Sequence, residues 1–175
     1  MGGSDEELML AYRDGAAAAF ETLYARHRGA LYRFMLRSLK DRAVAEELFQ
    51  EAWIRVIEAR DRYAPSARFT TWLYTIAHNL LVDHWRRKGL VLVELKDDEH
   101  ASHDNPAKQV EARESAARFL QALEALPPAQ REAFLLHEEA GMTVAEIAAA
   151  TGTNEEAAKS RLRYAITKLK AVLDE

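Results

Sequence analysis

Hydrophobic residues recur every three to four positions through most of the chain, which is the spacing of amphipathic α-helices. The most informative segment is residues 68–88, RFTTWLYTIAHNLLVDHWRRK. At about 100° per residue, one side of this predicted helix is apolar and suited to a core, with Phe69, Leu73, Ile76, Ala77, Leu80 and His84. A second side carries Trp72, Thr75, Asn79 and Arg86, and the segment ends in Arg86, Arg87 and Lys88 before Gly89.

The second side of this helix has two interpretations. Aromatic rings for stacking, amides for base edges and cations for phosphates are the groups that bind unstacked nucleic-acid bases. An ordinary amphipathic helix with a solvated basic end would carry similar residues. The helix alone therefore leaves both interpretations open.

Before this segment, the spacing predicts helix over residues 5–39, broken near Asp14 and Gly15, and a further helix to about residue 60 with Asp41 as its N-cap. The outward face of that further helix is acidic, with one apolar residue: Glu47, Gln50, Glu51, Ile54 and Glu58. Such a face is either merely solvated or a docking surface for a basic protein element, for which an exposed isoleucine ringed by acids is suited.

Residues 61–67, DRYAPSA, are predicted to form a loop, because Pro65 cannot continue a helix and makes the preceding residue extended. The loop directly precedes the 68–88 helix, and loops on rigid scaffolds often carry binding residues. Residues 89–105 are predicted to form an acidic linker. His100 and His103 lie among its acids, but no ligand set with a defined metal geometry is present there.

After the linker, Asn105 and Pro106 predict a helix start, and Pro127-Pro128 end that helix and begin the next, which reaches Ala140 with Gly141 after it. Capping boxes at Thr143–Glu146 and Thr153–Glu156 predict a short helix closed by Gly152 and a longer helix to about residue 173. No segment alternates like a strand. The predicted fold is all-α, with two small helical domains (1–88 and 106–175) joined by the linker 89–105, the second domain being a helix-turn-helix.

The last predicted helix has the residues of a DNA recognition helix. Its apolar side would pack inward, while cations and small polar groups face outward toward phosphates and bases. The outward residues are Ser160, Arg163, Tyr164 and Thr167, with Lys159 and Arg161 on the two rims. Any exposed helix rich in lysine and arginine would look similar, but the two capping boxes beside the turn favour the recognition helix.

Composition changes this picture little. The 175 residues include no cysteine, which excludes disulfides, thiolate metal sites and thiol catalysis, and the net charge is −4. Residues 89–105 hold five acids against one lysine, so this segment alone accounts for the acidic excess and the remainder is balanced. No apolar run is long enough to span a bilayer or resembles a signal peptide. We therefore expect a cytoplasmic protein that is not inserted in a membrane.

No catalytic constellation is present in the sequence. His137-Glu138-Glu139 lacks the second histidine of a zinc protease motif, and no glycine-rich phosphate loop or nucleophile elbow occurs. His78 and His84 fall on different sides of their helix. We expect no enzymatic activity, no cofactor and no metal.

The chain resembles the bacterial sigma factors of the extracytoplasmic-function (ECF) group over nearly its whole length. The similar blocks occur in the expected order: FETLYARHRGALYRF at 20–34, AEELFQEAW at 45–53, RFTTWLYTIAHN at 68–79, LPPAQREAFLLHEEAGMTVAEIAAATG at 126–152 and KSRLRYAITKL at 159–169. Several long blocks in order are more specific than any single motif.

The resemblance implies a transcription initiation factor that binds core RNA polymerase, through the β′ clamp and the β flap, and directs it to promoters. The first domain would melt the −10 element and hold a flipped base, and the last helix would read the −35 element as duplex. The linker would run through polymerase toward the RNA exit path. Relatives are commonly held inactive by an anti-sigma factor, so one is an expected partner, alongside duplex and single-stranded promoter DNA.

The residue roles follow from the same resemblance. Polymerase binding is expected of Glu47, Gln50, Glu51 and Ile54. Contacts to the −10 element are expected of Tyr63, Ser66, Arg68, Trp72, Thr75, Asn79, Arg86 and Arg87. Contacts to the −35 element are expected of Thr143, Lys159, Ser160, Arg161, Arg163, Tyr164 and Thr167. Relatives vary at Arg163, Tyr164 and Ile166, so the −35 bases that are read do not follow from the resemblance.

Two alternatives belong to other classes. A stand-alone helix-turn-helix regulator, whose first domain binds a ligand or dimerises, would bind duplex tightly without polymerase. An all-helical enzyme using His78, Asp83 and His84 is disfavoured because these three residues do not converge on the predicted helix.

Overall fold

The computed structural model describes residues 2–89 and 112–174. Within these ranges the chain forms eight α-helices and one short 3-10 helix and no strand, so the all-α prediction is confirmed. The helices are α1 (Asp5–Arg13), α2 (Ala17–Ser38), α3 (Arg42–Glu58), η1 (Arg60–Arg62), α4 (Phe69–Arg87), α5 (Ala112–Ala125), α6 (Pro128–Ala140), α7 (Val144–Thr151) and α8 (Glu155–Leu173). Apart from Gly89, the predicted linker and the predicted helix start at Pro106 lie outside the described residues.

Most predicted helix ends are confirmed. Asp41 accepts hydrogen bonds from the backbone N–H groups of Ala43 and Val44 and so caps α3. Thr143 and Glu146 form the predicted capping box of α7. Gly141 and Gly152 follow α6 and α7 with φ of 65° and 67°, a left-handed conformation that glycine adopts without strain.

The predicted N-cap at Thr153 is wrong. The cap of α8 is Asn154, whose side-chain oxygen accepts from the backbone N–H of Ala157 at 2.8 Å. The sequence pattern places this cap one residue too early, because Thr153 and Asn154 are both good N-cap residues and spacing does not choose between neighbours. The recognition helix therefore begins at Glu155, and Ala157 occupies the third helical position.

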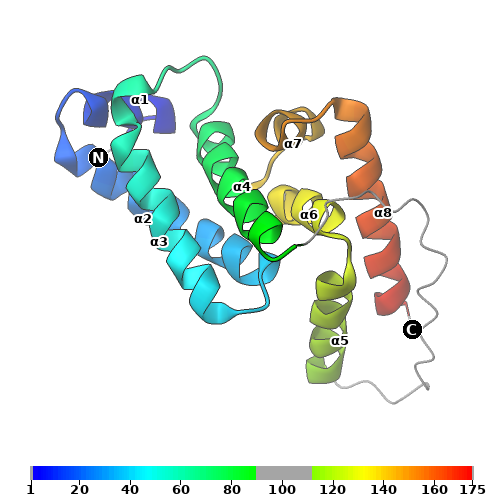
Figure 1. Ribbon diagram of the computed structural model, residues 1–175. Helices are drawn as coiled ribbons and strands as arrows, with labels where there is room; N and C mark the ends of the chain where they lie inside the picture. The colour runs from blue at the N-terminus through cyan, green and yellow to red at the C-terminus, as the bar shows by residue number, and fades with distance from the viewer. Residues whose placement is uncertain (1, 90–111, 175) are drawn as a thin grey trace.

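Helices α1–α4 pack around an aromatic core. The ring of Trp53 on α3 lies edge-on to Phe20 and Tyr24 of α2, with ring centroids 5.9 and 5.0 Å apart. Deeper in, Phe34 of α2 meets Tyr74 of α4 edge-on at 5.3 Å. Edge-to-face contacts of this kind add to the stabilisation that comes from burial. They fix α3 and α4 against α2 (Figure 1).

The start of α4 is capped from another helix. Arg68 occupies its N-cap position, but its side chain makes no capping hydrogen bond. Instead Glu6 of α1 reaches across and accepts from the backbone N–H of Phe69 at 2.6 Å. A carboxylate at this place satisfies one of the free N–H groups and also complements the positive end of the helix dipole. Helix α1 therefore holds the N-terminal end of α4, which directly follows the loop at residues 64–68.

Helices α5–α8 form the second group, with α8 packed against α5, α6 and α7. Pro127 lies in the turn between α5 and α6, Pro128 begins α6, and the buried Arg131 bonds back to this turn. Its guanidinium donates to the backbone oxygens of Glu124 and Leu126, at 2.9 and 3.3 Å. Burial lowers the pKa of Arg131 below its ordinary value. These bonds satisfy carbonyl groups left open at the end of α5.

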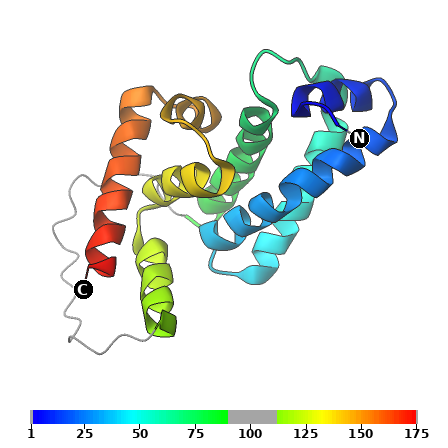
Figure 2. The same cartoon turned by 180° about the vertical axis from the view of Figure 1, so that it is seen from behind.

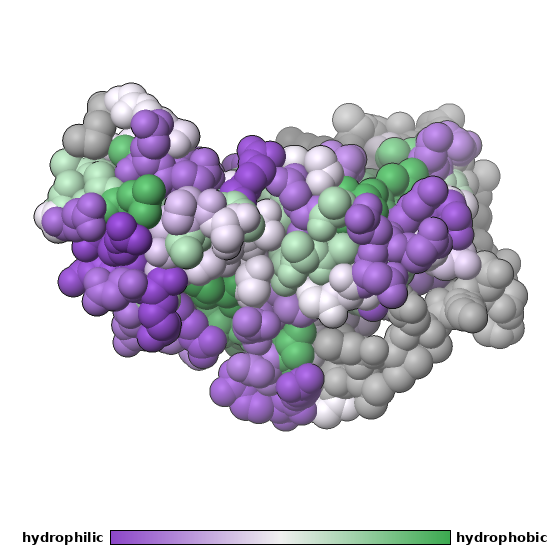
Figure 3. All heavy atoms as spheres, turned by 90° about the horizontal axis from the view of Figure 1, so that it is seen from above, coloured by the Kyte–Doolittle hydropathy of each residue, from purple (hydrophilic) through white to green (hydrophobic). Residues whose placement is uncertain are grey.

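The two groups of helices pack directly on each other. Helix α6 packs against α2, and α7 packs against α4, so the second group lies beside the first in both opposite views (Figure 1 and Figure 2). The buried hydrophobic residues form one cluster that runs through both groups. Helix α4 is therefore buried on more than its predicted apolar side, because Tyr74, Leu81 and Trp85 are buried as well. Seen from above, hydrophilic residues cover most of the coloured surface, and the hydrophobic patches are small and separate (Figure 3).

The cap supplied by Glu6 can be tested by substitution. Replacing Glu6 by alanine removes the acceptor for the N–H of Phe69, and we expect the free energy of unfolding to fall by about 0.5–2 kcal/mol. Glu6→Gln keeps a carbonyl oxygen at the same place and should lose less. Urea unfolding followed by circular dichroism measures both. Equal stability of the wild type and both variants would show that the contact contributes nothing.

Candidate nucleic-acid and protein interfaces

The outward face of α3 is exposed as predicted. Glu47 and Gln50 are exposed, while Glu51 is partly engaged by Arg55 one turn later at 3.5 Å. Ile54 stands among them with 47% of its surface exposed. The opposite side of α3 is buried in the core. The structure therefore brings the four predicted polymerase-binding residues together on one exposed face, which we call the α3 face.

The loop before α4 differs from the prediction at Tyr63. This ring is only 2% exposed and packs against Phe69 and Trp72, with ring centroids 6.4 and 5.1 Å away. Burial, with smaller contributions from Glu6 and Asp5, raises the pKa of its hydroxyl to about 12. A ring in this position cannot contact DNA, so the structure does not support Tyr63 as a −10 contact. The alternation of polar and small residues around it gave no signal that this ring turns inward.

Tyr63 instead anchors the loop. Its backbone oxygen accepts from the guanidinium of Arg13 on α1 at 3.3 Å. Beyond this anchor, residues 64–68 are all exposed, including the predicted contacts Ser66 and Arg68. The loop therefore presents its side chains to solvent from a base that α1 and α4 hold in place.

The second side of α4, with Trp72, Thr75, Asn79 and Arg86, which we call the polar stripe, is partly exposed. Asn79 is exposed, as are Arg86 and Arg87 at the end of the helix. Trp72 is half-buried against Phe69 and Tyr63. Thr75 is also half-buried, and its hydroxyl donates to the backbone oxygen of Thr71 at 2.7 Å.

Cations lie at both ends of this stripe, Arg68 just before α4 and Arg86 near its C-terminal end. At 1.5 Å per residue, about 27 Å of helix separates Arg68 from Arg86. Asn79 lies between them as the exposed amide. A strand bound along α4 would therefore meet cations at both ends and an amide within the helix.

The recognition helix α8 has the predicted orientation. Ala158, Leu162, Ala165 and Leu169 are buried on one side. Lys159, Arg163 and Thr167 are exposed, and Ser160, Arg161 and Tyr164 are half-buried. The guanidinium of Arg163 lies over the ring of Tyr164, 5.4 Å from its centroid. Thr143 is exposed, but its hydroxyl is already the acceptor of the α7 capping box.

The contacts between the two groups of helices were not predicted. Three glutamates of the second group, Glu132, Glu139 and Glu146, each accept from a basic side chain of the first group. Because they follow one another over α6 and α7, we call them the acidic row. The row supplies ion pairs and side-chain hydrogen bonds between the two groups.

Each contact of the acidic row is short. Glu139 accepts from Arg33 at 2.7 Å and from Arg37 at 2.9 Å, both on α2. Glu132 meets the Nδ1 atom of His78 at 2.7 Å. Glu146 accepts from Arg68 at 3.2 Å. Cations of the first group therefore face carboxylates of the second.

Glu146 serves two structures at once. Its Oε1 atom accepts from the backbone N–H of Thr143 at 2.9 Å, and its Oε2 atom accepts from Arg68. Burial raises the pKa of this carboxyl, but the bonds from Thr143 and Arg68 outweigh burial and leave the pKa below its ordinary value. The group is therefore ionised at neutral pH.

One signal for the acidic row was present in the sequence. Glu132 and Glu139 are seven residues apart, so they share one side of α6 with the apolar residues of that helix, among them Leu135 and Leu136. A glutamate on the inward side of a helix requires a basic partner. The sequence does not show which partner supplies it.

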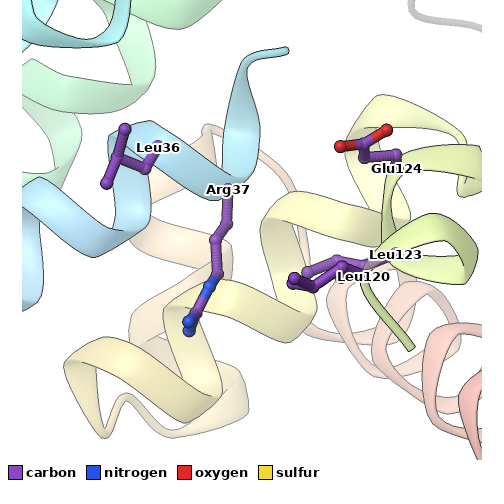
Figure 4. A pocket seen from close by; sticks show the side chains of 5 residues that line it. All are labelled: Leu36, Arg37, Leu120, Leu123 and Glu124. Atoms are coloured by element: carbon purple, nitrogen blue, oxygen red, sulfur yellow. The ribbon is translucent and has the colours of Figure 1, made fainter. Parts of the chain in front are cut away.

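A shallow hollow of about 220 Å³ opens between α2 and α5. Leu36 and Arg37 of α2 line it together with Leu120, Leu123 and Glu124 of α5, and Leu120 and Leu123 point toward α2 (Figure 4). Its lining offers apolar surface and one charge of each sign, and no nucleophile beside a general base. Within residues 2–89 and 112–174 no group of three potential metal ligands occurs. None of the helices in those residues is long and apolar enough to cross a membrane.

The chain has a helix-turn-helix, and its other group of helices exposes a polar stripe with a cation at each end. These features are typical of a DNA-binding protein with two helical domains. Comparison with known proteins agrees with this class and narrows it. The family "Sigma-70 region 2" matches residues 23–90, and the family "Sigma-70, region 4" matches residues 116–169.

Individual relatives match over nearly the whole chain. The RNA polymerase sigma factor CarQ of Myxococcus xanthus is 36% identical over 94% of both chains. The ECF RNA polymerase sigma factor SigL of Mycobacterium tuberculosis is 30% identical, covering 92% of this chain and 94% of its own. The structure of CnrH in complex with the cytosolic domain of CnrY is 28% identical, with a TM-score of 0.73 over 98% of both chains.

The chain belongs to the ECF group of RNA polymerase sigma factors. It is a transcription initiation factor that directs polymerase to promoters. The alternative of a stand-alone helix-turn-helix regulator is not favoured by these matches.

Proposed function

We propose that this sigma factor uses three separate exposed surfaces for its three tasks. The α3 face binds core RNA polymerase, the loop at 64–68 with the polar stripe of α4 captures the −10 element, and α8 reads the −35 element. The observation that carries the proposal is that all three sets of residues, apart from Tyr63, are at least partly accessible on a chain of this family. An enzyme with one active site would not need three separate accessible surfaces.

The surface chemistry supports the polymerase assignment. The α3 face joins acidic side chains with an exposed isoleucine, so it suits a partner that is basic and partly apolar. The β′ clamp of polymerase is the proposed partner of this face, and the β flap that of the helix-turn-helix domain. We assign residues 1–88 to the first domain, 89–105 to a linker and 106–175 to the second domain.

Capture of the −10 element needs a base taken out of the duplex. Unpairing and unstacking one base costs a few kcal/mol, which contacts to the extruded base must offset. The exposed amide of Asn79 has a donor and an acceptor for a base edge. Ser66 and Arg68 on the loop, Trp72 and Thr75 on α4, and Arg86 and Arg87 at its end complete the proposed surface.

Recognition of the −35 element is assigned to α8 and the start of α7. Lys159 and Arg161 on the rims suit phosphates, which position the helix without reading sequence. Ser160, Arg163, Tyr164 and Thr167 lie between the rims and suit base edges. Thr143 at the start of α7 is the remaining proposed contact.

We also propose an anti-sigma factor as a regulatory partner, which the family resemblance implies. The solved complex of CnrH with the cytosolic domain of CnrY supports the idea that this fold is bound by a second protein. We place the protein in the cytoplasm, where bacterial polymerase acts, and assign it no catalytic activity of its own.

Run-off transcription with purified core polymerase tests the function. We expect discrete transcripts from a library of genomic promoter fragments only when both the chain and core enzyme are present. Tight, specific duplex binding by the isolated chain, together with no transcription from core enzyme, would instead favour the stand-alone regulator.

Charge reversal at Glu51 tests the α3 face. Glu51→Lys places a cation opposite a basic partner, so we expect the affinity for core polymerase to fall by tenfold or more. The free energy of unfolding should change by less than about 0.5 kcal/mol, because the site is on the surface. Glu138→Lys, the same change on the exposed side of α6, is the control. Titration of labelled polymerase measures both, and equal affinities would exclude the assignment.

Replacement of Asn79 tests base capture. Asn79→Ala should reduce open-complex formation by tenfold or more, which corresponds to about 1.4 kcal/mol. Thermal stability should stay equal or rise slightly, since alanine is the better residue inside an exposed helix. Permanganate reactivity of promoter thymines reports opening, and a melting curve reports stability. A variant that melts at a lower temperature yet opens promoters normally would show that Asn79 has a structural role only.

A further inference from the structure

The arginines of the first group of helices differ in whether a carboxylate neutralises them. Seven of the twelve in residues 2–89 form an ion pair with a carboxylate, namely Arg13, Arg26, Arg33, Arg37, Arg42, Arg55 and Arg68. Within the described residues the other five form none and are all exposed: Arg28, Arg60, Arg62, Arg86 and Arg87. Arg86 and Arg87 already belong to the proposed −10 surface. Arg60 and Arg62 have no task in the proposed function.

These two arginines lie at the opposite end of the −10 surface from Arg86 and Arg87. They belong to η1, the short 3-10 helix that leads into the loop at residues 64–68. The next residue, Tyr63, packs its ring against Trp72 at the start of the polar stripe, with 5.1 Å between the ring centroids. The connection from α3 to α4 also lies beside α1 (Figure 1). Helix η1 is therefore continuous with the surface that the loop and α4 present.

The connection between α3 and α4 carries an excess of positive charge. Residues 59–68, ARDRYAPSAR, hold three arginines and one acid, the exposed Asp61. Arg60 and Arg62 precede the loop, and Arg68 follows it. The loop therefore has cations on both sides, whereas acidic side chains gather on the α3 face.

Arg60 is held in place without being neutralised. Its Nη1 atom donates to the hydroxyl oxygen of Tyr12 at 3.2 Å, and its guanidinium carbon lies 5.3 Å from the centroid of the Tyr12 ring. A contact between a cation and the face of a ring leaves the charge intact. Tyr12 occupies one of the five N–H donors of the guanidinium, and the remaining fork matches the oxygens of a phosphate. Arg60 is therefore oriented for an anion before the anion arrives.

Arg62 is available in a simpler way. Its side chain is exposed and makes no hydrogen bond or ion pair within residues 2–89 and 112–174. It directly precedes Tyr63, whose backbone oxygen is fixed by Arg13. The position of the Arg62 backbone is thus defined by its neighbour, while its guanidinium is free to reach a ligand.

We propose that Arg60 and Arg62 bind backbone phosphates of the promoter strand that the loop and α4 capture, so that the strand continues past the loop onto η1. This assignment rests on the proposed function of the loop and α4 and extends their surface at one end. Arg60 and Arg62 would hold the strand in register, and base reading would stay with the polar stripe, because phosphate contacts position a nucleic acid without reading its sequence.

Nucleic acid fits η1 better than an acidic protein does. Both ligands would be attracted by two arginines, but only the captured strand has to pass the loop at 64–68, which η1 directly precedes. The extruded base needs its flanking phosphates held while it is out of the stack. Phosphate binding also makes a quantitative claim, because each phosphate neutralised in a single strand adds about 0.7 to the dependence of affinity on salt.

Three variants separate charge from structure. Arg62→Gln removes a charge from a side chain without a partner, so the fold should be unaffected. Arg60→Gln, Arg62→Gln removes both charges, and Arg60→Lys, Arg62→Lys keeps both. Circular dichroism and urea unfolding verify that each protein is folded. Arg62→Gln alone keeps the test valid if loss of the Tyr12 contact disturbs η1.

Arg28→Gln is the matched control. Arg28 of α2 is also exposed, also lacks a carboxylate partner, and also lies over a tyrosine ring, 6.0 Å from the centroid of Tyr24. That ring packs against Phe49, which lies about 14 Å along α3 from its end at Glu58. The control therefore removes an arginine with similar surroundings that is not part of the connection to α4.

The affinity of polymerase carrying each variant is measured on bubble DNA over a range of salt concentrations. The probe is a promoter found by run-off transcription, with its −10 element left unpaired. We expect Arg62→Gln to weaken binding at low salt by at least threefold and to make the salt dependence shallower by about 0.7, and the double glutamine variant by about 1.4. The double lysine variant and Arg28→Gln should keep the wild-type salt dependence. Wild-type salt dependence for both glutamine variants would overturn the proposal.

Neutral phosphates locate the contact. Methylphosphonate linkages are placed one at a time along the unpaired strand of the same probe. At one or two linkages the wild type should lose at least threefold in affinity, while the double glutamine variant should lose nothing further. If every linkage affects both proteins equally, Arg60 and Arg62 do not bind the strand.

Two further measurements identify other reasons for a loss. Affinity for core polymerase without DNA should stay within twofold in all variants, and a tenfold fall with unchanged salt dependence on the bubble would assign η1 to polymerase and overturn the proposal. Asn79→Ala is measured on the same probe. If Asn79→Ala weakens binding and the arginine variants do not, the extension onto η1 alone fails. If Asn79→Ala also binds like the wild type, the proposed −10 surface itself fails.

Discussion

The structure depends on the burial of one helix, α4, from two directions. Its predicted apolar side packs into the core of the first domain, while Tyr74, Leu81 and Trp85 are buried as well. The start of the helix is fixed by the carboxylate of Glu6, and its side chains Arg68 and His78 meet the second domain. Asn79, Arg86 and Arg87 remain exposed on this helix for a ligand.

Local patterns predicted most of the fold because local interactions determine those features. A capping box, a proline turn or a glycine after a helix involves residues within four positions of each other. The ends of α3, α6 and α7 were predicted for this reason, and the apolar side of α4 followed from its spacing. The shift from Thr153 to Asn154 is a local choice between two similar caps, which spacing alone does not decide.

The errors and omissions concern contacts between residues distant in the sequence. Tyr63 looked like a loop residue available to DNA, but a pocket formed by Phe69 and Trp72 takes its ring. Glu132 and Glu139 share a side of α6, yet their partners lie on α4 and α2, 54 and more than 100 residues away. Periodicity shows which side of a helix is buried and does not show what buries it. For the same reason the buried and outward sides of α8 could be predicted, while the −35 bases that the helix reads could not.

The anchoring of Tyr63 has a consequence for the energetics of strand capture. A loop that is free in solution loses conformational entropy when it closes on a ligand, and this loss reduces the affinity. Here Arg13 holds the backbone at Tyr63, and Glu6 holds the first residue of α4, so both ends of the loop are already fixed in the free protein. Helix α1 thus preorganises the loop at residues 64–68. It contributes to strand capture by limiting the motion of this loop, although α1 itself is not proposed to contact DNA.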